Sequence, residues 1–178
     1  MWSDIYPISK RAHYTPFFKF VKWFSKMNYS IEKIAGIDCI FAPMTDGNAT
    51  TIEIMCKAGS IYETKENNGV SHFLEHLFFK GGKKYPTPKS VVETIDRFGG
   101  EVNAYTGDEY AGYYVKCAPE FIYEALDVLW DMMIHAAFPK EELEREKDVI
   151  IQELKMHEDN PMSLMMKKRQ ERYYGDNS

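Results

Sequence analysis

The chain has 178 residues, of which 44% are hydrophobic and 15% aromatic, so it is long enough for one domain with a core and is not a disordered protein. Its net charge of −5 argues against a nucleic-acid partner, and no apolar run approaches the roughly 20 residues that cross a membrane. The three cysteines, Cys39, Cys56 and Cys117, form no CxxC pair, which favours a reducing compartment, and we expect the cytoplasm.

Residues 1–26 differ in composition from the rest of the chain. Between Lys10 and Lys26 there are five basic residues and no acidic one, and aromatic residues lie among them. We interpret this segment as a basic, aromatic extension that lies outside the domain. A basic amphipathic helix can also contact a membrane surface, here with residues 10–26, but we favour this less because one short segment anchors weakly.

A folded domain begins at about residue 27. Two strands are expected first, at 36–43 and 50–60, and we expect them to pair through the turn TDGN at 45–48. In the second strand Ile52, Ile54 and Cys56 alternate with more polar residues, which indicates that one face of the strand is more buried.

Helices and strands then follow in separate groups. A helix is expected at 69–79 with Ser71 as its N-cap, and another after the cap residue Thr87, ending at the sequence FGG. The segment 101–118 predicts two strands around a turn at Gly107–Asp108, and three prolines then mark helix starts, at 119, 139 and 161. This order predicts an α+β fold, with an antiparallel sheet and helices packed on one side of it.

The sequence HFLEH places three chemically active side chains on one face of the first helix. His72 and His76 lie one turn apart and can bind one ion, while Glu75 reaches the same side. Zinc accepts two imidazoles, a third protein ligand and a water, and a nearby carboxylate can take a proton from that water. The alternative is a polar helix face, but the apolar residues between the histidines indicate a helix that is partly buried.

A third ligand must come from another part of the chain. The sequence EELEREKDVIIQELKMHED places Glu146 and Glu153 two turns apart on one helix face, so one could bind the ion while the other orients a ligand. His157 lies one turn beyond Glu153 and is also a candidate. Spacing alone does not choose among these three residues.

Three blocks of the sequence resemble the M16 metallopeptidases, whose zinc motif is HxxEH. They are AGSIYETKENNGVSHFLEHLFFKG, FGGEVNAYTGDEYAGYYVKC and EREKDVIIQELKMHEDNP, and the resemblance covers residues 31–175. It implies that residues 27–178 are a partial M16-type catalytic domain with the α+β fold of that family. It also implies a zinc-dependent endopeptidase that cleaves peptides or unfolded segments.

Site residues follow from the resemblance by matching positions. His72, His76 and Glu153 match the ligands of one Zn²⁺ per chain, and Glu75 matches the general base. Glu146 matches a second glutamate that supports catalysis. The strand that contains Asn103, Ala104 and Thr106 matches the segment that binds substrate through main-chain hydrogen bonds.

The resemblance also implies partners beyond this chain. In the family the domain continues past the region that matches RYYGDNS, and a related second half closes over it. We therefore expect a peptide substrate and a second M16-like half or subunit, with further domains or a partner needed for activity. The alternative is a non-catalytic M16-like subunit that binds peptides or acts as a scaffold.

Overall fold

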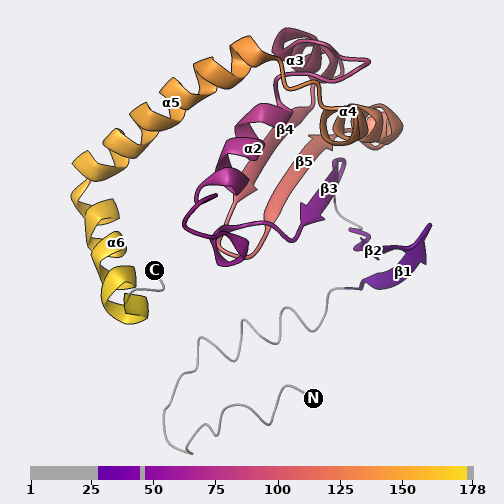
Figure 1. The fold of residues 1–178 in the computed structure, drawn as a ribbon. Coiled ribbons are helices and arrows are strands. Elements are labelled where there is room, and N and C mark those ends of the chain that lie inside the picture. Colours follow the sequence, from indigo (N-terminus) through magenta and orange to yellow (C-terminus); the bar gives the residue numbers. More distant parts are fainter. Residues whose placement is uncertain (1–27, 45–46, 176–178) are drawn as a thin grey trace, which may run out of the picture. The chain divides into compact units, whose positions relative to one another are not determined.

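A computed structural model describes residues 28–44 and 47–175 of the chain, which divide into two compact units, 1–47 and 48–178 (Figure 1). The expected N-terminal extension at 1–26, its membrane contact and its boundary with the domain lie outside the described residues and stay predictions.

The first unit contains a β-hairpin. β1 (Ser30–Ile34) pairs antiparallel with β2 (Ile37–Phe41), and the turn residues Ala35 and Gly36 have φ angles of 49° and 88°. Positive φ at both central residues is the geometry of a tight hairpin turn that matches strand twist. A strand at β2 was predicted from the sequence, whereas β1, which pairs with it, was not.

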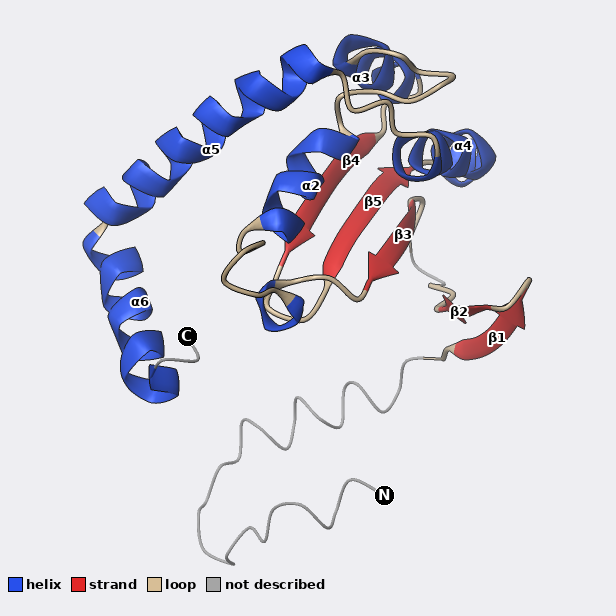
Figure 2. Ribbon diagram, in the orientation of Figure 1, coloured by secondary structure: helices blue, strands red, loops and turns tan. Residues whose placement is uncertain are grey.

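The second unit contains a three-stranded antiparallel sheet with the order β3-β5-β4. β3 (Thr50–Cys56) and β4 (Glu101–Thr106) both pair with the central strand β5 (Ala111–Cys117), as Figure 2 shows. The expected pairing of 36–43 with 50–60 through the turn at 45–48 includes residues outside the described ones and stays a prediction. A partner 63 positions further along the chain, as for Ile52 with Val115, leaves no local signal in the sequence.

Helices cover one face of this sheet. α2 (Val70–Phe78) and α3 (Pro88–Arg97) contact β4, whereas α4 (Ile122–Ile134) contacts β5 and β3. α5 (Lys140–Asp159) contacts α2, and α6 (Pro161–Tyr174) follows α5 after a bend; the short 3₁₀ helices are η1 (Ser60–Tyr62) and η2 (Pro119–Phe121). The opposite face of β3 and β4 is exposed, so the α+β fold with helices on one side is confirmed.

The core lies between β5 and the helices α3 and α4. Buried residues from these three elements are Val91, Ile95, Ala111, Tyr113, Val115, Cys117, Ala125, Val128, Leu129 and Met132. The alternation of buried and exposed residues along β3 agrees with the sequence analysis. No helix within 28–44 and 47–175 combines the length and the apolar character needed to cross a membrane.

A buried carboxylate fixes the loop that leads from α2 to α3. Asp131 of α4 is 3% exposed, and its Oδ2 accepts the main-chain N–H groups of Lys84 and Tyr85, both at 2.9 Å. A Cβ on Gly82 would come within 2.5 Å of the same carboxylate, which explains the glycine there. The C-terminal end of α2 is thus held against the core.

Candidate metal centre

The N-cap of α2 is Gly69, not the expected Ser71. Gly69 has φ 87°, and no side chain of its own caps the helix. Glu63 does this from the preceding loop: its carboxylate accepts the N–H of Gly69 at 2.6 Å and that of Ser71 at 2.8 Å. Burial raises the pKa of Glu63, but the hydrogen bonds lower it by more than burial raises it. The pKa of Glu63 is therefore below its usual value. A carboxylate therefore faces the positive end of the helix dipole.

Two imidazoles and one carboxylate converge on a single point beside α2. His72 Nε2 and His76 Nε2 are 3.3 Å apart, and Glu153 Oε2 of α5 lies 3.7 Å from the first and 3.5 Å from the second. Among the described residues this is the group of His, Cys, Asp or Glu side chains that is close enough to hold a metal ion.

These distances fit a tetrahedral ion. Zinc bonds of about 2.1 Å at tetrahedral angles place the ligand atoms about 3.4 Å apart. The three measured separations lie on either side of this value, and all three residues are half-buried, so one side of the group is open for a fourth ligand. Two neutral imidazoles and a carboxylate are also the donor set that zinc accepts in catalytic sites.

Glu146 of α5 holds the other nitrogen of His76. Its Oε2 lies 3.0 Å from His76 Nδ1, and its Oε1 lies 2.6 Å from Lys80 Nζ. Burial raises the pKa of Glu146, but the hydrogen bonds from Lys80 and His76 outweigh burial and lower it. The carboxylate therefore accepts the Nδ1 proton, which leaves the Nε2 lone pair of His76 for a metal.

Glu75 contacts the strand β4. The Thr106 hydroxyl donates a hydrogen bond to Glu75 Oε2, and this bond joins α2 to the edge of the sheet. Beneath the helix, burial and the negative charge of Glu75 both raise the pKa of Tyr113, so that phenol stays neutral. Thr106 was expected at the substrate, and the structure places its hydroxyl on the expected general base.

The other two expected substrate residues lie next to each other on the same edge strand. Asn103 is exposed, and Ala104 is half-buried and packs against the core. Asn103 Oδ1 accepts the N–H of Ala104 at 2.9 Å and so covers a main-chain donor at the edge of the sheet. An extended chain that pairs with β4 here would have to displace this side chain.

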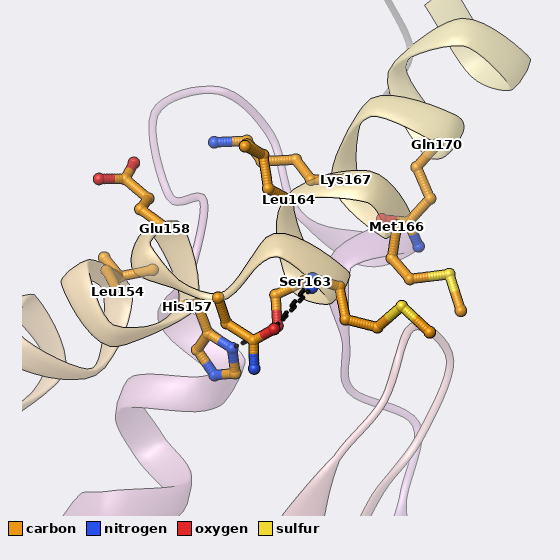
Figure 3. Close-up of a pocket in the computed structure, with 10 residues that line it drawn as sticks. Leu154, His157, Glu158, Ser163, Leu164, Met166, Lys167 and Gln170 are labelled. Carbon is orange, nitrogen blue, oxygen red and sulfur yellow. Dashed lines mark hydrogen bonds between the residues drawn. The ribbon is translucent and has the colours of Figure 1, made fainter.

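His157, one candidate for the third ligand, does not lie beside the two imidazoles but in a hollow elsewhere on the chain. Figure 3 shows it at the bend between α5 and α6, where its Nδ1 is 3.5 Å from Ser163 Oγ. The hollow has a volume of about 590 Å³ and is lined by both polar and apolar side chains, the latter including Leu154, Leu164 and Met166. Of the three candidates that spacing left open, the structure places Glu153 at the imidazoles, Glu146 behind His76 and His157 elsewhere.

Two residues of the centre were not singled out from the sequence. Glu63 lies six residues before the helix start that it caps, beyond the usual range of a capping pattern, and no local signal marks it. Lys80 lies two residues after the end of α2, but its contact with Glu146 spans 66 residues of sequence. Both contacts depend on how the chain folds back on itself.

Known proteins resemble this chain in sequence and in fold. The family model "Insulinase (Peptidase family M16)" matches residues 42–178. An uncharacterized zinc protease of Bacillus subtilis is 43% identical over 130 residues, which covers 73% of this chain and 32% of that protein. The solved structure of pitrilysin has a TM-score of 0.65 and 25% identity, and the match covers 74% of this chain and 14% of pitrilysin.

Two relatives are subunits of mitochondrial complexes by name. The mitochondrial-processing peptidase subunit beta of Dictyostelium discoideum is 40% identical over 109 residues, or 61% of this chain and 23% of that protein. Core protein I of the ubiquinol-cytochrome-c reductase complex of Euglena gracilis is 39% identical over 109 residues, or 61% of this chain and 22% of that protein. The chain spans about a third or less of the length of these curated relatives.

Proposed function

The chain belongs to the insulinase family of peptidases, family M16, and from this premise we propose that it carries the catalytic centre of a zinc-dependent endopeptidase. The observation that carries the proposal is the convergence of His72, His76 and Glu153 at separations of 3.3 to 3.7 Å, with Glu75 on the same helix. The relatives named as zinc proteases support the choice of metal.

One Zn²⁺ per chain would be held by His72 Nε2, His76 Nε2 and a carboxylate oxygen of Glu153. When bound, zinc polarises a carbonyl group and lowers the pKa of water. Glu75 would act as general base by taking a proton from the attacking water and passing it to the leaving amine. Since Thr106 holds Glu75 Oε2, Oε1 is the oxygen that would receive this proton.

The remaining residues would place the ligands and the substrate. Glu146 would keep His76 in the tautomer that binds metal, which is how a second glutamate supports catalysis without touching the substrate. The outer edge of β4, with Asn103 and Ala104, would pair with an extended peptide through main-chain hydrogen bonds. Such pairing favours peptides and unfolded segments over folded proteins.

We expect a second M16-like half or subunit as partner, and no nucleic acid. A relative that is named as one subunit of a processing peptidase supports this expectation. Because the chain spans at most about a third of these relatives, further domains or a partner would complete the peptidase. Activity of the chain alone is not part of the proposal.

A second candidate is a non-catalytic M16-like subunit that binds peptides or acts as a scaffold. The relative named as a core protein of a respiratory complex, and not as a protease, favours it. The complete ligand set and the adjacent Glu75 favour the catalytic function instead, because a scaffold needs neither.

Metal content is the first test, because it needs no partner. Purified wild type should contain close to one zinc per chain by elemental analysis, and Glu153→Gln should lose most of it. Glu158→Gln, an exposed change on the same helix, is the matched control and should retain zinc. A folded wild type without zinc would refute the proposed site.

Peptide cleavage by the completed protein separates the two candidates. Glu75→Gln should abolish cleavage and keep the zinc, because Glu75 is not a ligand in the proposed site. A wild type that holds zinc, pairs with its partner and cleaves no peptide would support the scaffold instead.

A further inference from the structure

A charged residue is the most buried residue of α5. α5 has 20 residues, and Glu146 is its one buried residue within the described part of the chain. The helix contacts α2 and α6, and many of its apolar side chains, including Ile151 and Leu154, are about half exposed. Leu143, Val149 and Ile150 of α5 are half-buried, so the one fully buried group that α5 contributes is the Glu146 carboxylate.

Lys80 is the cationic partner of that carboxylate. Its Nζ lies 2.6 Å from Glu146 Oε1, and the two side chains are 17% and 5% exposed. The N–H of Lys80 donates to the carbonyl of Leu77 at 3.0 Å, so the backbone of Lys80 closes the last turn of α2. The cation is thus attached firmly to the C-terminal end of the helix that carries both histidines, where it also complements the helix dipole.

Holding Glu146 also decides where Glu153 lies. Seven residues separate them, which is about 10 Å along α5 and almost two full turns, so both project from nearly the same side. A rotation of α5 by one residue, about 100°, would turn Glu153 away from His72 and His76. Holding Glu146 between Lys80 and His76 therefore fixes both the position of α5 along its axis and its rotation about that axis at the metal centre.

We propose that Lys80 is a positioning residue of the metal centre, which acts through Glu146 to orient His76 and to bring Glu153 to the ion. Without Lys80, the Glu146 carboxylate would keep one partner for two buried oxygens. An incompletely paired buried charge is costly, so the carboxylate would turn toward solvent and release His76 Nδ1. The inference rests on the proposed zinc site and assigns a role to a residue that binds neither metal nor substrate.

Zinc affinity of the whole chain, measured by competition with a chromophoric chelator, tests this role. Lys80→Met should bind zinc about tenfold or more weakly, within the range found when partners of metal ligands are removed. Lys83→Met removes an exposed lysine three residues away and should leave the affinity within about twofold of the wild type. Lys80→Arg keeps the charge and should lie closer to the wild type than Lys80→Met.

The double variant distinguishes action through Glu146 from a general loss of positive charge. Glu146→Gln alone should weaken zinc binding, and adding Lys80→Met should weaken it no further, because the residue through which Lys80 acts is already changed. Additive losses would overturn the proposal, as would wild-type affinity in Lys80→Met.

Folding and metal binding are controlled separately. Circular dichroism of the metal-free variants reports whether they fold, and if Lys80→Met does not fold, Lys80→Gln takes its place with the same expected loss. If the wild type binds zinc and Lys80→Met binds it with the same affinity, the positioning role is refuted and the proposed function is not. A folded wild type that binds no zinc would refute the metal site, and the positioning role with it.

Discussion

The Glu63→Gln substitution tests what caps the N-terminus of α2, the helix that carries His72 and His76. The Glu63 carboxylate accepts two main-chain N–H groups, at 2.6 Å from Gly69 and 2.8 Å from Ser71, and no side chain at Gly69 caps the helix. Loss of a capping side chain costs about 0.5 to 2 kcal/mol, and loss of a negative charge at a helix N-terminus about 0.3 to 1 kcal/mol. Glutamine keeps one oxygen and so one of the two bonds. We therefore expect Glu63→Gln to lower the free energy of unfolding by about 1 kcal/mol.

Urea unfolding of the metal-free chain at pH 7 measures this change, with Glu109→Gln in the exposed turn between β4 and β5 as the control. The pH dependence gives a second reading. Because the pKa of Glu63 is lowered in the folded chain, its contribution is present above the pKa of the unfolded chain, about 4.3, and is lost as the pH falls through the folded value. Equal stability of wild type and Glu63→Gln at pH 7 would refute the capping role. A difference of the same size well below the folded pKa would refute its electrostatic cause.

Three further predictions concern the metal centre and the core. Thr106→Val in the completed peptidase should lower kcat about tenfold or more with KM and zinc content unchanged, because Thr106 holds Glu75. Thr106→Ser keeps the hydroxyl and should retain most activity. A raised KM with normal kcat in Thr106→Val would instead indicate that Thr106 binds the substrate. Zinc at 100 times its Kd should stabilise the chain by about 2.7 kcal/mol, measured as a Tm that rises with zinc and falls again with a chelator. No Tm shift for the wild type, or an equal Tm shift for Glu153→Gln, would contradict the proposed zinc site. Leu129→Ala at a position with 0% exposure should cost about 2 to 5 kcal/mol in urea unfolding, whereas Leu154→Ala at 56% exposure should cost much less; similar costs would contradict the assigned core.

Much of the secondary structure could be predicted because its signals are local. Thr87 caps α3 through a hydrogen bond from the N–H of Ser90, and Pro88 begins that helix, as expected from a cap followed by proline. The alternation in β3 also predicted which of its faces is more buried. By contrast β1 was missed, since its apolar residues do not alternate and its Ala35–Gly36 turn is not a typical hairpin sequence.

Strand partners were harder to predict than strands. Each strand of the sheet exposes hydrogen-bonding groups on two edges, and the sequence of β3 does not specify which strand will occupy them. The strand that pairs with both β3 and β4 is β5, whose alternate residues are buried.

The sequence by itself determined the part of the centre that lies on one helix. His72, Glu75 and His76 share a face because helical geometry relates residues three and four positions apart, whatever the rest of the chain does. Only the tertiary structure decided which carboxylate lies beside the two imidazoles and which lies behind His76. His76 and Glu146 are 70 residues apart in sequence, and which glutamate lies beside the imidazoles depends on how α5 is rotated against α2. That rotation arises from contacts between distant residues, and spacing along one helix carries no information about it.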